Sequence, residues 1–227
     1  MREIVLDTET TGLDPVDGHR MVEIGAVELV NRIPTGRTYH QYLNPERDID
    51  AESIRIHGIT NEHVKDMPTF AQAADAFLAF IEGAGLVIHN APFDMKFLNF
   101  ELDLMGRGPL TNTVVDTIPM ARSKFPGAQV NLDALCRRFE IDLSVRVYHG
   151  ALLDSQLLAE VYLELMGGRQ PDLAFADTES ADAEAASRFR ITAPKAARTF
   201  APSPEELANH EAYIAKIANS LWQSDNK

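Results

Sequence analysis

Cysteine and long apolar runs are nearly absent from this sequence of 227 residues. Cys136 is the single cysteine, which excludes a disulfide framework and a zinc site built on cysteine ligands, and which fits a reducing cytoplasm. No apolar run reaches the roughly 18 residues of a membrane span, and the first residues, MREIVLDTET, lack the apolar core of a signal peptide. We therefore expect a cytoplasmic protein without a membrane segment.

Positive charge is scarce as well. The sequence has 21 Lys and Arg against 34 Asp and Glu, which gives a net charge of −13. Tight binding of DNA usually requires a basic surface that releases counterions from the phosphates. The shortage of positive charge argues against a protein that binds nucleic acid on its own. If DNA is the substrate, another protein must hold most of it, or a metal must offset the acidic groups.

The composition, 45% hydrophobic and 24% charged, is that of a globular protein and excludes a collagen, a coiled-coil rod and a largely disordered chain. The length corresponds to about 1.5 domains. Apolar periodicity predicts strands at 3–6 (ending at Asp7), 21–30, 38–43, 86–88 and 114–116, and helices at 70–81, 93–105, 132–139 and 152–166. This order predicts an α/β fold with a mixed five-stranded sheet flanked by helices.

The composition changes after residue 168, where the chain becomes rich in alanine and proline. We expect a domain over 1–170, a flexible linker over 171–202 and a terminal helix over 203–227. Ser203, Pro204 and Glu206 have the pattern of a helix start with a capping box. A lone helix needs its apolar side buried, either on the domain or on a partner. That side contains Leu207, Ile214, Ile217, Leu221 and Trp222.

Four carboxylates stand where predicted strands end or helices begin. Asp7 and Glu9 project to the same side of an extended chain, where like charges are unfavourable unless a cation lies between them. Asp94 falls in the first turn of the helix that follows the fourth predicted strand. Asp154 lies in an apolar stretch, where a carboxylate needs a partner, and His149 can approach it from the loop before that helix.

Each group also has a plainer interpretation. Asp7 and Glu9 could form an exposed acidic turn, Asp94 could be an ordinary helix-start acid, and His149 could be a loop histidine with a simple hydrogen bond. Together, four carboxylates and a histidine are the inventory for two-metal phosphodiester hydrolysis, in which two divalent cations, Mg²⁺ or Mn²⁺, clamp the attacking and leaving oxygens. The sequence contains no phosphate-binding loop and no dinucleotide fingerprint.

Three ordered motifs resemble the DEDDh exonucleases: DTETTG at 7–12, NAPFD at 90–94, and His149 with four residues before Asp154. Within that family the sequence is most similar, over about residues 1–170, to the proofreading epsilon subunits of bacterial DNA polymerase III. The sister DEDDy group has a tyrosine three residues before the last acid, and Tyr148 stands at the wrong spacing for it. The resemblance implies a ribonuclease-H-like fold and 3′-to-5′ release of nucleoside monophosphates.

The same resemblance implies roles for individual residues. Asp7, Glu9 and Asp154 would hold the first metal. Asp7 would bridge to the second metal, which Asp94 would support directly or through water, and His149 would be the general base. Besides Asp7, Glu9 and Asp154, the implied substrate contacts are Thr10, Glu52, His57 and Phe93. His57 as a capping residue and Phe93 as a core residue remain as alternatives.

The tail resembles partner-binding segments. The peptide QPDLAF at 170–175 is similar to the peptide by which polymerase-associated proteins bind the sliding clamp, with Gln170, Leu173 and Phe175 as its contacts. A simple helix-exit segment is the alternative. In layout, the terminal helix resembles the part of epsilon subunits that binds the polymerase catalytic subunit. A further small accessory subunit is left open.

Tethering would explain the acidic charge, because the polymerase and clamp would hold the DNA while the exonuclease binds a frayed 3′ end. We therefore expect a proofreading exonuclease of the bacterial cytoplasm that joins the nucleoid during replication. Two alternatives remain. One is a stand-alone DEDDh exonuclease acting on RNA ends, and the other is a non-catalytic subunit that stabilises a polymerase.

Overall fold

The structure is a computed structural model that describes residues 1–144, 146, 148–168 and 201–217. The chain divides into two units, Met1–Leu173 and Ala174–Lys227, and each is described by itself. Among the described residues, no helix combines the length and the apolar character that crossing a membrane would require.

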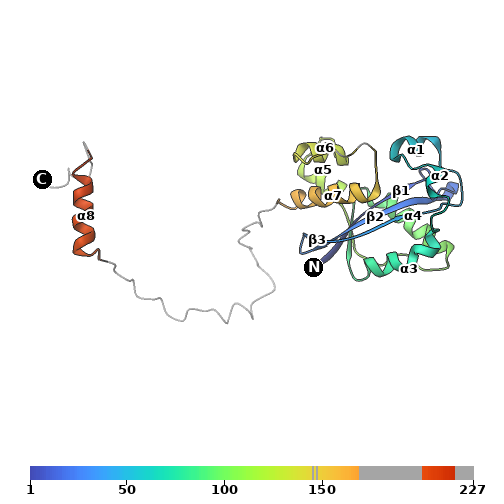
Figure 1. Ribbon diagram of the computed structural model, residues 1–227, viewed down its shortest axis with the longest axis horizontal. Helices are drawn as coiled ribbons and strands as arrows, with labels where there is room; N and C mark the ends of the chain where they lie inside the picture. Colours follow the sequence, from blue (N-terminus) through green and yellow to red (C-terminus); the bar gives the residue numbers. More distant parts are fainter. Residues whose placement is uncertain (145, 147, 169–200, 218–227) are drawn as a thin grey trace. The chain divides into compact units, whose positions relative to one another are not determined.

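The first unit is built on one five-stranded sheet in the order β3-β2-β1-β4-β5 (Figure 1). β1 pairs with β2, and β2 with β3, in antiparallel fashion, whereas β1, β4 and β5 run parallel. The mixed sheet predicted from the sequence is therefore confirmed. Its strands are β1 (Arg2–Thr10), β2 (Met21–Val30), β3 (Ile33–Tyr42), β4 (Gly85–Ile88) and β5 (Val114–Asp116).

Helices cover both faces of the sheet, as Figure 1 shows. Ile4 and Leu6 of β1 are buried in a core with α3 (Phe70–Ile81) and α4 (Ala91–Leu104). Val5, which points to the opposite face, is buried in a second core below the other helices. Those helices are α5 (Thr117–Lys124), α6 (Leu132–Arg138) and α7 (Ala151–Leu165). Two short helices, α1 (Ala51–His57) and α2 (Asn61–Val64), and the 3₁₀ turn η1 (Pro15–Asp17) complete the unit.

Two strands are longer than the sequence predicted. β1 does not end at Asp7 but continues to Thr10, because its backbone stays paired with β2. β3 begins at Ile33 rather than at residue 38. Pro34 and Gly36 obscured its first half, and proline is tolerated there because β3 is an edge strand.

Three short helices, α1, α2 and α5, were not predicted. α1 has seven residues and α2 has four, too few to display a helical period. α5 contains Pro119, which breaks the pattern. The long helices were predicted to within a few residues, and α3 matches its predicted bounds.

The second unit contains α8 (Pro204–Ile214), which begins as the sequence predicted. The Ser203 hydroxyl accepts a hydrogen bond from the Glu206 N–H at 3.2 Å, and the Glu206 carboxylate accepts one from the Ser203 N–H at 2.7 Å. None of the residues of α8 is buried. The predicted linker, except for residues 201 and 202, and the predicted helix beyond residue 217 lie outside the described residues.

Candidate active site

Asp7 and Glu9 lie in the last four residues of β1, which continues to Thr10 beyond the strand end predicted at Asp7. They continue the face of β1 that begins with Val5, because side chains on one face recur every second residue. Across the antiparallel pair, Asp7 stands opposite Gly25 and Glu9 opposite Glu23 of β2. Both acids therefore point to the side of the sheet that α7 covers.

The start of α7 is fixed directly on β2. A side chain at Gly25 would place its Cβ 2.1 Å from the backbone carbon of Ala151, so only glycine permits this approach. The Ser155 hydroxyl donates to the Gly25 carbonyl at 2.9 Å, and a Glu23 carboxylate oxygen accepts the Ala151 N–H at 3.0 Å. This packing sets the position of Asp154, which lies in the first turn of α7 and is buried.

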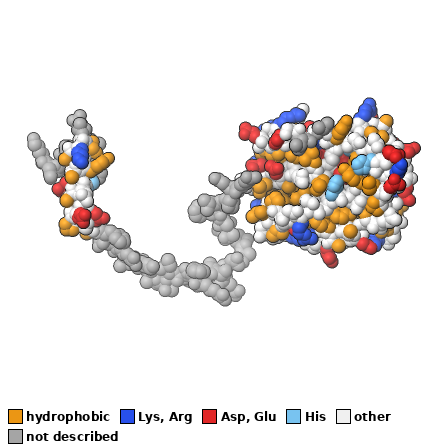
Figure 2. Space-filling view, in the orientation of Figure 1, with side chains coloured by type: hydrophobic (Ala, Val, Ile, Leu, Met, Phe, Trp, Pro, Cys, Tyr) orange, Lys and Arg blue, Asp and Glu red, His pale blue; other side chains and the backbone are white. Residues whose placement is uncertain are grey.

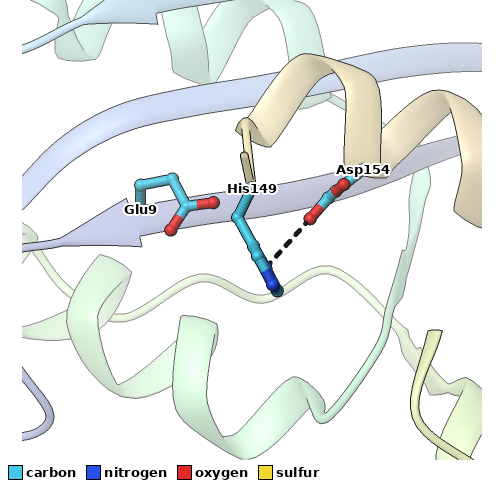
Figure 3. A group of neighbouring side chains, drawn as sticks. All are labelled: Glu9, His149 and Asp154. Carbon is cyan, nitrogen blue, oxygen red and sulfur yellow. Dashed lines mark ion pairs between the residues drawn. The ribbon is translucent and has the colours of Figure 1, made fainter. Parts of the chain in front are cut away.

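Glu9, His149 and Asp154 converge, although they come from β1, a loop and α7 (Figure 3). One ligand atom from each lies within 4.8 Å of the other two. The His149 Nδ1 is 3.4 Å from an Asp154 oxygen, the contact dashed in Figure 3. The loop before α7 is held by a hydrogen bond of 3.1 Å from the His149 N–H to the Ile56 carbonyl, and the imidazole remains half exposed.

Asp94 approaches the same edge from the other face of the sheet. It lies in the first turn of α4 and is only 2% exposed. The Thr8 hydroxyl, which points away from Asp7 and Glu9, donates to the Asp94 Oδ1 at 2.7 Å. The cluster thus straddles the sheet where the parallel strands end, the usual position for ligand sites in α/β proteins.

Burial, together with repulsion from nearby carboxylates, raises the pKa values of three of these acids. Burial, followed by the nearby charges of Asp94, Glu9 and Asp154, holds the pKa of Asp7 well above its usual value. Burial and the charges of Asp154 and Glu23 raise the pKa of Glu9 to about 9. Burial raises the pKa of Asp94 to about 7, although the hydrogen bond from Thr8 acts in the opposite direction. Such a group of acids is stabilised by cations.

Asp154 behaves differently. Burial alone would raise its pKa, but the hydrogen bonds and charges of Arg146 and His149 outweigh burial and lower it. Arg146 donates two hydrogen bonds of 2.6 Å to the two oxygens of Asp154. Arg146 lies outside the sequence motifs that predicted the site.

Comparison with known proteins identifies the family. The family model described as "Exonuclease" matches residues 4–162, which contain the whole acidic cluster and His149. This chain belongs to the exonuclease family. It is 51% identical to the DNA polymerase III subunit epsilon of Rickettsia conorii, over 98% of this chain and 99% of the relative. It is 47% identical to the DNA polymerase III subunit epsilon of Escherichia coli, over 98% of each chain.

Solved structures support the fold of the exonuclease domain. The nuclease domain of 3'hExo, a DEDDh family member bound to rAMP, aligns with a TM-score of 0.64 and 22% identity, over 73% of this chain and 91% of that one. Exonuclease X in complex with 5′ overhanging duplex DNA aligns with a TM-score of 0.58 and 24% identity, over 72% and 90%. The predicted ribonuclease-H-like exonuclease fold is confirmed.

The ligand atoms of the acidic cluster suit divalent metal ions, which membership of the exonuclease family implies. Carboxylate oxygens dominate it, and hard cations such as Mg²⁺ and Mn²⁺ prefer oxygen ligands. Burial, with repulsion from neighbouring carboxylates, raises the pKa values of Asp7, Glu9 and Asp94, and added positive charge would favour their ionised forms.

The predicted substrate contacts lie in different environments. The Thr10 hydroxyl is buried and donates to the Gly12 carbonyl at 2.6 Å. His57 ends α1 and is buried. Its Nδ1 accepts the Ile59 N–H at 3.0 Å, and its Nε2 is buried. Phe93 packs partly on the core of α3 and α4, with its ring centroid 5.2 Å from that of Phe97.

Glu52 does not join the acidic cluster. Its side chain is 80% exposed on α1 and lies 3.5 Å from Arg55. The partner-binding residues remain predictions. Leu207 is exposed on α8 and Ile214 ends that helix. The others lie outside the described residues, namely Gln170, Leu173, Phe175, Leu221 and Trp222.

Three residues that were not among the predicted site residues hold the cluster together. Thr8 supports Asp94, Glu23 supports the start of α7, and Arg146 binds Asp154. Thr8 is separated from its partner by 86 positions and Glu23 by 128, so no local spacing could reveal these contacts. Arg146 could have been suspected, because it is a basic residue only three positions before His149.

Proposed function

We propose that this chain is the 3′-to-5′ proofreading exonuclease subunit of a bacterial DNA polymerase III, and that it removes mispaired nucleotides from the primer 3′ end. The observation that supports this proposal is the extent of the likeness to proteins named DNA polymerase III subunit epsilon. It spans 98% of this chain in both relatives and therefore includes the tail as well as the exonuclease domain.

The acidic cluster would hold two divalent cations, Mg²⁺ or Mn²⁺. Asp7, Glu9 and Asp154 would bind the first, and Asp7 with Asp94 would bind the second, directly or through water. When bound, two such cations supply Lewis acidity to the attacking and leaving oxygens of the phosphodiester. Thr8 and the start of α7 keep the carboxylates in place.

His149 would act as the general base. Its imidazole is half exposed beside Asp154, so it can reach a water molecule at the substrate phosphate. The water oxygen attacks phosphorus while its proton passes to the imidazole. The bond from phosphorus to the 3′ oxygen of the preceding nucleotide breaks, and a nucleoside monophosphate leaves. General base catalysis of this kind contributes about 10²- to 10⁴-fold to a rate.

The terminal nucleotide would lie against Thr10, Glu52, His57 and Phe93. The buried imidazole of His57 lies near the backbone of Thr10, another of these predicted contacts, which supports a shared place at the substrate. The partly exposed ring of Phe93 could stack on any base, which suits removal without sequence preference.

Partners would supply the DNA affinity that the chain lacks. On the visible face of the first unit in Figure 2, Lys and Arg side chains of the described residues lie scattered among acidic and apolar ones. The terminal helix at 203–227 would bind the polymerase catalytic subunit, and the peptide at 170–175 the sliding clamp. A small accessory subunit is a further candidate partner. We expect the assembly in the bacterial cytoplasm, at the nucleoid during replication.

The decisive experiment is a nuclease assay of the wild type and Asp7→Ala with Mg²⁺ or Mn²⁺. We expect the wild type to shorten single-stranded DNA from its 3′ end, and the variant to lose at least about 10³-fold in rate because a metal ligand is gone. Glu62→Ala removes an exposed acid far from the cluster in the sequence and should have no effect. An inactive wild type would instead favour the non-catalytic polymerase-stabilising subunit.

Two further nuclease assays distinguish the remaining alternatives. A stand-alone exonuclease for RNA ends would degrade RNA faster than DNA, whereas the proofreading proposal predicts the reverse. A tethered enzyme should degrade mispaired duplex primer ends faster when the polymerase subunit is added. Equal rates with and without the polymerase would contradict tethering but not the nuclease activity.

A further inference from the structure

Arg146 reaches into the acidic cluster from the loop before α7. Its side chain is only 7% exposed. Its Nε and Nη2 donate to the two oxygens of Asp154, both at 2.6 Å, which is the bidentate geometry of the strongest arginine–carboxylate pairs. The same Nη2 lies 3.0 Å from the His149 Nδ1. One guanidinium therefore engages both the predicted base and a predicted metal ligand.

A second carboxylate anchors this guanidinium from outside the cluster. The Arg146 Nη1 donates to the Asp133 Oδ1 at 2.5 Å. Asp133 lies on α6, and its side chain is 40% exposed. Arg146 thus has a place to remain if it releases Asp154.

Arg146 and a divalent cation would bind the same two carboxylate oxygens of Asp154. Asp154 uses one oxygen for Nε and the other for Nη2, so both face a positive charge already. A second cation within about 4 Å of a buried guanidinium would be strongly repelled in this environment. The two cations cannot share Asp154 in the observed geometry without a strong penalty.

We propose that Arg146 is a positioning residue that competes with a divalent cation for Asp154. It holds Asp154 and His149 in place before an ion binds, and it retains only Asp133 once an ion takes Asp154. This inference rests on the proposed metal-dependent function and adds to it a residue that sets the affinity for the ion.

The competition also bears on His149. The His149 Nδ1 lies near both Arg146 and Asp154, so it can accept from the guanidinium or donate to the carboxylate, but not both at once. While it accepts from Arg146, the proton of the neutral imidazole is on Nε2. Neither nitrogen can take a proton from water in that arrangement. Once the guanidinium withdraws, Nδ1–H can donate to the Asp154 oxygen that lies 3.4 Å away, which leaves the lone pair on Nε2.

Calorimetric titration of Mn²⁺ into the full chain, without nucleic acid, tests the proposal. Arg146→Gln should bind Mn²⁺ about tenfold more tightly, because a competing cation is removed. Arg137→Gln is the matched control. It deletes the same charge from an exposed arginine that lies 3.8 Å from Asp133, and it should change the affinity less than about twofold.

Asp133→Asn gives a prediction of the opposite sign. Arg146 then has only Asp154 to bind, so Mn²⁺ binding should weaken about threefold, whereas the same substitution made in Arg146→Gln should have little effect. Thermal unfolding supplies a second measurement. Arg146→Gln should lower Tm in EDTA but show a larger rise in Tm with Mn²⁺ than the wild type.

Unchanged or weaker Mn²⁺ binding by Arg146→Gln would overturn the proposal, since it would mean that Arg146 supports the ion. If Arg146→Gln does not fold, Asp133→Asn still tests the proposal. Unchanged or tighter Mn²⁺ binding by Asp133→Asn would contradict competition between Arg146 and the ion. A wild type that binds no Mn²⁺ would overturn the metal-dependent function itself, whereas normal wild-type binding with no change in the variants overturns only the role of Arg146.

Discussion

At the scale of single residues, Thr8 shows how a neutral side chain tunes the acidic cluster. It alternates with Asp7 and Glu9 along β1 and therefore points to the opposite face, where it donates to Asp94. A hydrogen bond to an ionised carboxylate stabilises the charged form. Thr8 thus restrains the pKa of Asp94, which burial raises to about 7.

Thr8→Val should shift the pH dependence of activity upward. Loss of a hydrogen bond to a charged group costs about 1.5 kcal/mol or more, so the pKa of Asp94 should rise by about one unit and the acidic limb of the activity profile should move with it. Rates measured from pH 6 to about pH 9 with Mn²⁺ test this. Thr8→Ser should restore the profile.

Thr35→Val is a matched control for this experiment. Thr35 also donates to a carboxylate, the Oε2 of Glu28 at 2.8 Å, but on the edge strand β3. Its replacement should leave the pH profile unchanged. A profile that moves equally in both variants, or in neither, would contradict the role assigned to Thr8.

The sequence predicted the chemical groups of the site better than their supports. Asp7, Glu9, Asp94, His149 and Asp154 stand in motifs with fixed local spacing, and the structure brings them to one edge of the sheet. Their supports depend on pairings across the fold that only the folded chain reveals. The interpretation of Asp7 and Glu9 as an exposed turn does not fit the geometry, because both residues lie in β1 and Glu9 is buried. The role of His149 stays a prediction.

At the scale of elements, the contact between β2 and α7 positions the acidic cluster. Glu23 and Gly25 lie on one face of β2, and together they accept two hydrogen bonds from α7 and allow it to touch the strand. Glu23 also bonds to the His40 ring on β3 at 2.6 Å. Two neighbouring strands, β2 directly and β3 through Glu23, are therefore tied to the helix that carries Asp154.

Gly25→Ala should weaken both folding and activity. The added methyl would lie 2.1 Å from backbone atoms of α7, which cannot move away as a flexible side chain can. We expect a loss of about 1–3 kcal/mol or more in the free energy of unfolding, measured with urea, and weaker Mn²⁺ binding. Gly108→Ala adds a methyl in open space and should change stability by less than about 0.5 kcal/mol.

Elements with a strong period were predicted well, and elements shaped by contacts were not. The apolar residues of α3 recur at helical spacing, and the helix has the predicted bounds. By contrast, β1 extends past Asp7 because β2 pairs with it, and the edge strand β3 extends through Pro34. Such boundaries depend on neighbouring strands, which a local pattern does not contain.

At the scale of the whole molecule, the clustered acids make the stability of the folded chain depend on pH. The folded chain keeps protons on Asp7, Glu9 and Asp94 at pH values where the unfolded chain has released them. The folded state therefore binds more protons, and its stability falls as pH rises through this window. Asp154, whose pKa is lowered, acts in the opposite direction but only at lower pH.

The free energy of unfolding in EDTA should accordingly decrease from about pH 4 to about pH 9, the interval between the usual pKa of a carboxyl group and the value of about 9 for Glu9. Saturating Mn²⁺ should remove most of this decrease, because it replaces the protons. Glu9→Gln should flatten the slope in EDTA, whereas Glu62→Gln, an exposed acid, should not. A slope of the opposite sign would contradict the ionisation behaviour described for the cluster.

The distance along the chain between the two halves of the cluster has a consequence for biosynthesis. Asp7 leaves the ribosome early, but Asp154 follows about 150 residues later, which at 5–20 residues per second is a delay of about 7 to 30 s. A nascent or prematurely terminated polypeptide that stops before α7 lacks a complete catalytic centre. The newly made chain is therefore harmless to nearby nucleic acid until translation has passed α7.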